Sequence, residues 1–248
     1  MSRYFIGTSG WSYGHWERRF YPKGLQQKKW LEFYSQHFYS VEINMTFYRW
    51  PKPSFFLSSY KRTPKDFRFT LKATRLITHI KKLKNVKKLV NDFYKLASLL
   101  KEKLACILWQ LPPSFKPNGK NIKKLEKFLK LLNKKYKNVI EFRHEDWWQE
   151  KFYKLLEKYN VCFCIVSGIE MPKDVVVTSG IVYFRFHGDN YSSCYTEKQM
   201  KDYAEKMKKI VNRKSKDKIK EIYAYFNNDS NAYAIKNAKQ LKRFLGGK

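Results

Sequence analysis

The sequence predicts a single-domain α/β protein of the (β/α)₈-barrel class, and three observations support that prediction. Eight short apolar runs alternate with segments whose apolar residues recur at helical spacing. The chain has 248 residues, enough for one such barrel, and it contains no linker, repeat or low-complexity tract, so one domain is expected over residues 1–248. A doubly wound open sheet is the less favoured alternative, because no G-x-G-x-x-G motif opens the first helix.

The predicted strands are short and rich in β-branched and aromatic residues. Their expected bounds are Tyr4–Thr8, Ser40–Asn44, Phe67–Lys72, Ala105–Gln110, Val139–Arg143, Val161–Val166, Ile181–His187 and Glu221–Asn227.

Amphipathic helical patterns separate most of these strands. The clearest patterns run from Ile80 to Leu100, Ile122 to Leu132, Trp148 to Tyr159, Met200 to Val211 and Ala234 to Leu245. Thr196 and Gln199 form a capping-box pattern before the fourth of them. The segment after the sixth strand has no good helical pattern, so the sixth unit of the barrel is predicted to be degenerate.

Five of the strands carry polar residues on one face. Glu42 and Asn44, for example, alternate with the apolar Val41 and Ile43. An open parallel sheet is covered on both faces and is expected to be apolar on both. A barrel explains the pattern, because the polar face lines its interior and reaches the carboxyl ends of the strands, where barrel enzymes place their sites.

The candidate site residues lie on these polar faces or in the loops that follow them. They are Trp11, Glu42, Asn44, Lys72, Gln110, Glu141, Arg143, His144, Trp147, Arg185, His187, Tyr191, Asn227 and Asp229. Glu42, Glu141 and His187 are the candidate catalytic residues, because carboxylates and imidazoles transfer protons. The others are candidate substrate-binding residues: the cations suit an oxyanion and the aromatic rings suit a base or sugar.

Glu141 and Arg143 share a strand face and are expected to divide the work at the site. Arg143 would hold a substrate oxyanion, while Glu141 would transfer a proton or hold a metal-bound water. The alternative is structural, with Glu141 neutralising Arg143 or Arg185 in a buried ion pair.

Metal binding is weakly signalled by the sequence. It has no H-x-H, H-E-x-x-H or C-x-x-C spacing and only five histidines, of which His15 and His37 are expected away from the mouth. A trinuclear zinc site is therefore not expected, whereas one Mg²⁺ or Mn²⁺ held by carboxylates stays open as a cofactor. The four cysteines are expected to be reduced, mostly in the core.

The formal net charge of +31 is the strongest global feature of the chain. Such a field attracts polyanions, so nucleic acid, either DNA or RNA, is the expected partner, with a small anion in the mouth as a further possibility. The alternative is compositional, because the lysines fill the polar faces of helices. The sequence shows no secretion signal and no membrane-spanning run, which predicts a cytoplasmic protein that does not enter a membrane.

Several longer segments complete the sequence pattern. In chain order they are "GTSGWSYGHW", "FYP", "VEINMTFYRWP", "TPKDFRFTLKAT" followed by His79, "QLPPSF", "EFRHEDWW", "FRFHG", and "YAYFNND" followed by "NA" at Asn237–Ala238. From Ser9 almost to the C-terminus, this series resembles the YecE-like family, also called DUF72. The resemblance implies a TIM-type barrel, which looks related to the group that contains endonuclease IV and sugar isomerases. It implies no particular activity, because the function of the family is not established.

The residues favour an enzyme that acts on a phosphate-bearing substrate, and a nucleic-acid phosphodiester is the leading hypothesis. The chain would then be a nuclease-like hydrolase. One alternative is an isomerase or hydrolase of a sugar or sugar phosphate, and another is a nucleic-acid-binding barrel without catalytic activity.

Overall fold

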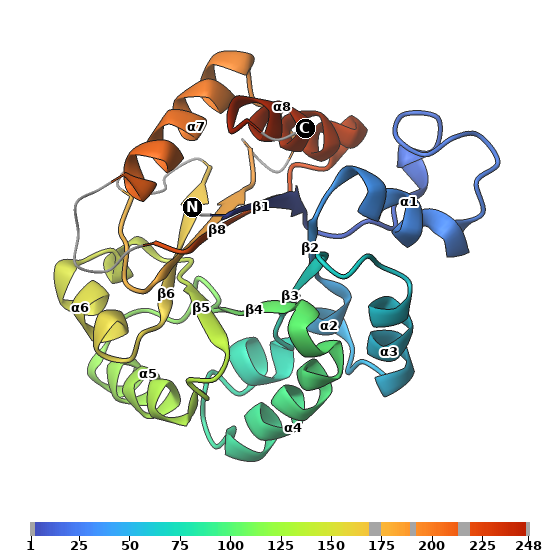
Figure 1. The fold of residues 1–248 in the computed structure, drawn as a ribbon. Coiled ribbons are helices and arrows are strands. Elements are labelled where there is room, and N and C mark those ends of the chain that lie inside the picture. Colours follow the sequence, from blue (N-terminus) through green and yellow to red (C-terminus); the bar gives the residue numbers. More distant parts are fainter. Residues whose placement is uncertain (1–2, 169–174, 189–191, 213–218, 247–248) are drawn as a thin grey trace.

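The computed structural model describes residues 3–168, 175–188, 192–212 and 219–246. Within these residues eight strands form one sheet, in the order β1-β8-β7-β6-β5-β4-β3-β2, with helices around it (Figure 1). The strands are β1 Arg3–Thr8, β2 Ser40–Ile43, β3 Arg68–Lys72, β4 Leu104–Gln110, β5 Lys137–Glu141, β6 Cys162–Ser167, β7 Ile181–Phe186 and β8 Glu221–Phe226.

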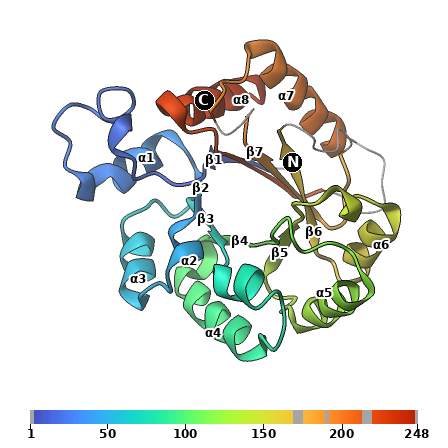
Figure 2. The same ribbon diagram turned by 180° about the vertical axis from the view of Figure 1, so that it is seen from behind.

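Every ladder between these strands is parallel, and the sheet curls into a nearly closed barrel (Figures 1 and 2). This confirms the predicted TIM-type architecture, and the predicted strands match the observed ones to within two residues at each end. The parallel arrangement brings all strand carboxyl ends to one end of the barrel, called the mouth below.

Helices surround the sheet on its outer side (Figure 2). Those in the described residues are α1 Trp30–His37, α2 Met45–Tyr48, α3 Pro53–Lys61, α4 Lys87–Ala97, α5 Gly119–Leu131, α6 Glu150–Lys158, α7 Glu197–Val211 and α8 Tyr233–Phe244. The predicted capping box of Thr196 and Gln199 is present at the start of α7. Between β6 and β7, residues 175–180 form no helix, and residues 169–174 lie outside the described part. None of the helices in the described ranges is long and apolar enough to cross a membrane.

The alternation of side chains produces two separate cores. Outward-facing residues such as Val41 and Phe69 pack beneath the helices, whereas inward-facing residues such as Leu108 and Tyr223 fill the barrel. All four cysteines are free thiols, and three of them are buried. The apolar lower interior leaves the mouth as the place where inward-facing polar residues gather.

β1 and β2 close the barrel through side chains and one isolated bridge between Ser9 and Glu42, instead of a ladder. Gly7 makes this close approach possible, because a Cβ there would lie 2.0 Å from the Ser40 carbonyl oxygen. The Tyr34 hydroxyl donates to the same oxygen at 3.1 Å. The seam therefore brings Glu42 to the rest of the barrel mouth.

Candidate functional site

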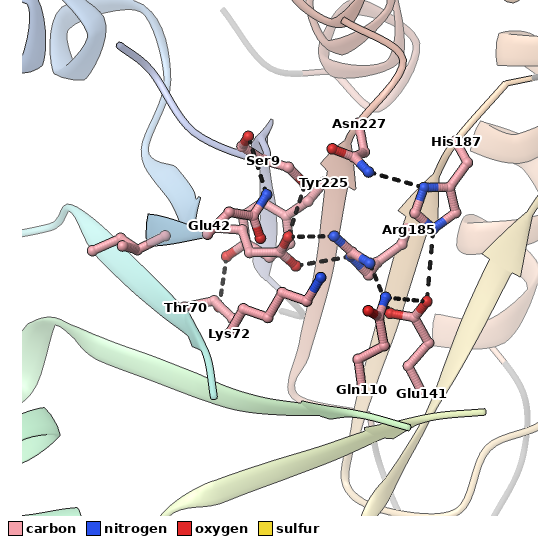
Figure 3. Close-up of polar contacts among 12 residues, drawn as sticks. Ser9, Glu42, Thr70, Lys72, Gln110, Glu141, Arg185, His187, Tyr225 and Asn227 are labelled. Atoms are coloured by element: carbon pink, nitrogen blue, oxygen red, sulfur yellow. Dashed lines mark hydrogen bonds and ion pairs between the residues drawn. The ribbon is translucent and has the colours of Figure 1, made fainter. Parts of the chain in front are cut away.

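Arg185 of β7 lies at the centre of the mouth, between carboxylates from two other strands (Figure 3). Its Nε and Nη2 donate to Oε2 and Oε1 of Glu42 on β2, at 3.0 and 2.7 Å. Its Nη1 donates to Oε2 of Glu141 on β5 at 2.8 Å. Only 1% of Arg185 is exposed and both carboxylates are fully buried, so these three residues form the floor of the mouth.

Glu42 has a donor on each side besides Arg185. The Ser9 hydroxyl donates to its Oε1 at 2.8 Å, and the Tyr183 hydroxyl donates to its Oε2 at 2.5 Å. With two donors on each oxygen, the carboxylate is held both from β7 and from the residue that follows β1.

Glu141 is held in a similar way. Gln110 Nε2 donates to its Oε1 at 2.8 Å, and Arg143 Nη1 lies 3.1 Å from the same oxygen. Burial alone would raise the pKa of Glu141, but the Arg185 and Arg143 guanidinium groups hold that pKa well below its usual range. Glu141 is therefore a carboxylate at any physiological pH.

This arrangement corrects the expectation that Glu42 and Glu141 face a substrate. Both are buried below the mouth, and their oxygens are occupied by protein donors. The structural alternative raised for Glu141 matches the geometry, because it is paired with both Arg143 and Arg185. The two carboxylates thus hold the guanidinium groups of Arg185 and Arg143 in position.

A cavity of about 510 Å³ opens above this floor. It is lined by Phe47, Tyr48, Lys72, Arg75, His79, Gln110, Arg143, Arg185, His187 and Asn227. The structure thus brings together Lys72, Gln110, Arg143, Arg185, His187 and Asn227, which the strand pattern had singled out. Three cations besides the paired Arg185 face the same space, which gives the cavity a positive character.

Lys72, the last residue of β3, has an unusual environment. It is 8% exposed, and its Nζ lies 4.1 Å from the centroid of the Phe47 ring. No acceptor among the described residues takes a hydrogen bond from this ammonium group, which Figure 3 shows pointing toward the centre of the site. Burial, with the nearby Arg185 charge, lowers the pKa of Lys72 to about 8. Lys72 is a desolvated cation that faces a cavity.

His187 follows β7 and stands beside Arg143. Its Nε2 lies 3.2 Å from Arg143 Nη1, and its Nδ1 lies 3.1 Å from the Asn227 amide nitrogen. Burial lowers the pKa of His187 to about 4, and the Arg185 charge adds to that effect while Glu141 opposes it. The imidazole is therefore neutral near pH 7.

The strand pattern missed four lining residues: Phe47, Tyr48, Arg75 and His79. A π-helical turn over Leu76–Ile80 carries His79 into the cavity, and such turns are frequent at functional sites. Burial lowers the pKa of His79 to about 4, and the charges of Lys72 and Arg75 contribute. The sequence did offer one signal that His79 is a site residue, because it lies in the loop after a predicted strand.

Trp147 and His144 do not lie at the cavity, which corrects their assignment as substrate-binding residues. Trp147 is fully buried and stacks on Phe142 and Phe115, with ring centroids 4.7 and 5.7 Å away. His144 forms a local contact instead, with Nδ1 3.4 Å from Asp146 Oδ2. Trp147 belongs to the turn over Glu145–Trp147, and His144 directly precedes that turn, so strand alternation does not determine where these two side chains point.

Trp11 and Asn44 line a second hollow of about 750 Å³, which shares Tyr48 with the cavity. It is called the aromatic groove below. Tyr191, another predicted substrate-binding residue, lies outside the described residues.

Asp229 lines a third and more open hollow together with His15, and Asn227 borders both this hollow and the cavity. His15 Nε2 lies 3.1 Å from Asp229 Oδ2, so the expectation that His15 is remote from the mouth was wrong. Burial raises the pKa of Asp229 to about 6, although contacts with Trp16 and His15 oppose the shift. Asp229 is thus paired beside the cavity and is not one of its lining residues.

In the described ranges, no group of three or more histidine, cysteine or acidic residues is arranged to hold a metal ion. The candidate ligands Glu42 and Glu141 bond to Arg185 instead. The groups that face the cavity are donors and cations, which suits an oxyanion.

Comparisons with known proteins agree with this architecture. The model of the family "Protein of unknown function DUF72" matches residues 5–248. UPF0759 protein YunF of Bacillus subtilis (strain 168) is 25% identical, over 97% of this chain and 94% of that protein.

Solved structures give the same result. A DUF72 family protein from Thermotoga maritima MSB8 superposes with a TM-score of 0.89 at 32% identity, covering 98% of this chain and 99% of that one. A DUF72 family protein from Enterococcus faecalis V583 has a TM-score of 0.83 at 23% identity, over 99% and 96% of the two chains, and supports the fold alone.

Proposed function

The chain belongs to the DUF72 family, and from this premise we propose that its barrel mouth binds and acts on a phosphate-bearing substrate. The observation that carries the proposal is the Lys72 ammonium group, which is nearly buried, faces the cavity and has no hydrogen-bond acceptor in the described part of the chain. A desolvated cation without a partner is unfavourable. A phosphate oxygen would supply the acceptor and an opposite charge.

The neighbouring cations extend the same interaction. Arg143 and Arg75 line the cavity with Lys72, and they come from the loops after β5 and β3. A planar guanidinium can donate two parallel bonds to one phosphate, while an ammonium acts as a point charge. The volume of about 510 Å³ is large enough for a phosphate group with part of its ester.

His187 is the residue that we propose for proton transfer. Its imidazole is neutral near pH 7 because its pKa is about 4, and a phosphate anion bound beside it would raise that pKa toward neutrality, where it could accept a proton from a water or hydroxyl nucleophile. Arg143 Nη1 lies 3.2 Å from this ring, so an anion held by Arg143 would be next to the base. Glu42 and Glu141 act as positioning residues in this proposal, through Arg185 and Arg143.

A nucleic-acid phosphodiester is the substrate class that the charge supports. A chain with a formal charge of +31 concentrates polyanions near its surface and releases counterions on binding them. An isomerase of sugar phosphates has less support, because the buried carboxylates are occupied by Arg185 and are not placed to move protons on a sugar. The cavity lining in the described residues offers no acidic ligand, so Mg²⁺ or Mn²⁺ enters the proposal only as an ion that the phosphate itself brings to the site.

The test is cleavage of labelled single-stranded and duplex oligonucleotides, with Mg²⁺, with Mn²⁺ and with a chelator. We expect cleavage by the wild type and a loss of roughly 10²-fold or more in His187→Gln, the usual size of a lost general base. We expect Lys72→Met to weaken binding. Lys88→Met is the matched control, because Lys88 is an exposed α4 lysine paired with Asp92.

The other outcomes also discriminate. Salt-dependent binding without cleavage under all three conditions would favour a non-catalytic nucleic-acid-binding barrel. Turnover of sugar phosphates but not of oligonucleotides would favour the isomerase alternative. If neither inorganic phosphate nor any oligonucleotide bound at low salt, the proposal would be abandoned.

A further inference from the structure

We infer that the aromatic groove beside the cavity binds the base of the same substrate, so that one nucleotide unit places its phosphate in the cavity and its base in the groove. This inference rests on the proposed function and narrows it, because it distinguishes a nucleotide from any other phosphate ester. The groove has a volume of about 750 Å³, comparable to the cavity itself.

One wall of the groove is aromatic. Trp11, from the loop after β1, and Phe55, from α3, have ring planes within 19° of each other and centroids 6.2 Å apart. Both rings line the groove and both are only partly buried. Such a wall presents π-faces on which a base can stack whatever its sequence identity.

Tyr48 connects the groove to the cavity, since it lines both. It is 71% exposed, the highest value among the exposed large hydrophobic residues, and it ends the short helix α2. An aromatic ring left in solvent between two hollows is well placed to contact a ligand that occupies both. Tyr48 is therefore the wall that the two hollows share, and a ligand that occupies both would contact its ring.

The polar groups of the groove are of the kind that a nucleotide needs. Asn44 lines the groove, and its Oδ1 is a buried acceptor without a hydrogen-bond partner in the described residues, while its Nδ2 donates to the Ser9 carbonyl. Rotation of the Asn44 amide toward the groove would let this oxygen accept from a ring N–H or an exocyclic amino group of a base. The exposed Arg49, also on the groove, would suit the next phosphate of a strand.

The test compares two fluorescein-labelled single strands of equal length and charge in anisotropy titrations. One is a short oligothymidylate and the other is its abasic counterpart, which has the same phosphates without bases. We expect the wild type to bind the base-bearing strand roughly tenfold more tightly, as expected for base–aromatic stacking. Trp11→Leu and Tyr48→Leu should each reduce this preference severalfold without changing the affinity for the abasic strand.

Two controls keep the experiment interpretable. Tyr48 is so exposed that Tyr48→Leu is expected to fold even if Trp11→Leu does not. Tyr39→Leu is the matched control, because Tyr39 is 54% exposed but precedes β2, at the end of the barrel opposite the mouth. Its preference for the base-bearing strand should equal that of the wild type.

The results separate this inference from the proposed function. If the wild type binds both strands equally, or if the preference survives in both groove variants, the groove is not a base site. The phosphate proposal then stands, provided that Lys72→Met weakens binding of the abasic strand. If the preference follows the groove variants but Lys72→Met binds the abasic strand normally, the groove inference holds and the phosphate proposal fails. If neither strand binds, both are overturned.

Discussion

The two deepest cations of the mouth, Arg185 and Lys72, differ in what surrounds them. Arg185 is 1% exposed and makes three charge-assisted hydrogen bonds to two carboxylates. Lys72 is 8% exposed, and its ammonium group lies over the Phe47 ring without a hydrogen-bond acceptor in the described residues. Burial is similar, so burial alone does not distinguish a structural charge from one available to a ligand. The number of protein hydrogen-bond partners does differ, and on this ground we propose that Arg185 is a structural charge and that Lys72 is available to a ligand.

The largest expected effect comes from removing the paired cation. Arg185→Met leaves Glu42 and Glu141 buried without their main counter-charge, which should lower the free energy of unfolding by about 3–5 kcal/mol. Urea denaturation followed by circular dichroism measures this change. The comparison requires that Lys72→Met change the same free energy by less than about 1 kcal/mol, or raise it, because it removes a desolvated cation.

The opposite ranking would break the comparison. If Arg185→Met unfolded at the wild-type urea concentration while Lys72→Met was strongly destabilised, Lys72 would be the structural charge. The main argument that the cavity binds an anionic ligand would then fail.

The second effect concerns ligand binding. Lys72→Met should weaken binding of sulfate, used as a phosphate mimic, by roughly tenfold to a hundredfold, as expected for the loss of one charge-assisted hydrogen bond. Isothermal titration calorimetry at low salt measures it, with Lys88→Met as the exposed-lysine control. Equal affinities in both variants would mean that sulfate binds to the general positive field and not to the cavity.

Most of the fold could be predicted from the sequence, because alternation along a strand is a local property. Glu42, Lys72 and Arg185 alternate with apolar neighbours, and all three face the barrel interior as expected. The ion pairs of Arg185 with two carboxylates could not be predicted from the sequence in the same way. It depends on which strands face each other across the barrel, which one strand pattern does not specify.

The wrong predictions about site residues concern residues that lie beyond the ends of strands. Trp147 was assigned to the mouth by its place after β5, but a 3₁₀ turn over Glu145–Trp147 directs the ring into the outer core. His15 and His79 were missed because their loops, and not a strand register, bring them to the mouth. Loop conformation depends on tertiary contacts that the pattern of residues does not reveal.

A third effect follows from the pKa of Lys72, which burial lowers to about 8. An anion binds the protonated form, so affinity for sulfate should fall as pH rises through about 8, approaching tenfold per pH unit. Sulfate keeps its charge over this range. Lys72→Arg should remove the fall, because a guanidinium stays protonated. A pH-independent affinity in the wild type would show that Lys72 does not contact the anion.

The same shift has a consequence for stability in the absence of ligand. The folded pKa lies below that of the unfolded chain, so between pH 8 and about 10 the folded protein binds fewer protons at Lys72. The contribution of Lys72 to the free energy of unfolding therefore increases with pH in this window. Subtracting the pH profile of Lys72→Met from that of the wild type isolates it.

The smallest expected effect concerns Arg143, which is intermediate between the two cations. It forms an ion pair with Glu141, as Arg185 does, but its side chain is 17% exposed and lines the cavity like Lys72. Arg143→Lys keeps the charge and loses the planar fork, so sulfate affinity should fall about threefold to tenfold, the value of one ordinary hydrogen bond. The free energy of unfolding should change little, because Glu141 keeps its bond to Arg185.

Calorimetry of sulfate binding and urea denaturation of the same preparation measure the two effects of Arg143→Lys. If Arg143→Lys loses as much stability as Arg185→Met and binds sulfate normally, Arg143 belongs to the floor, and the ligand meets Lys72 and Arg75 without it.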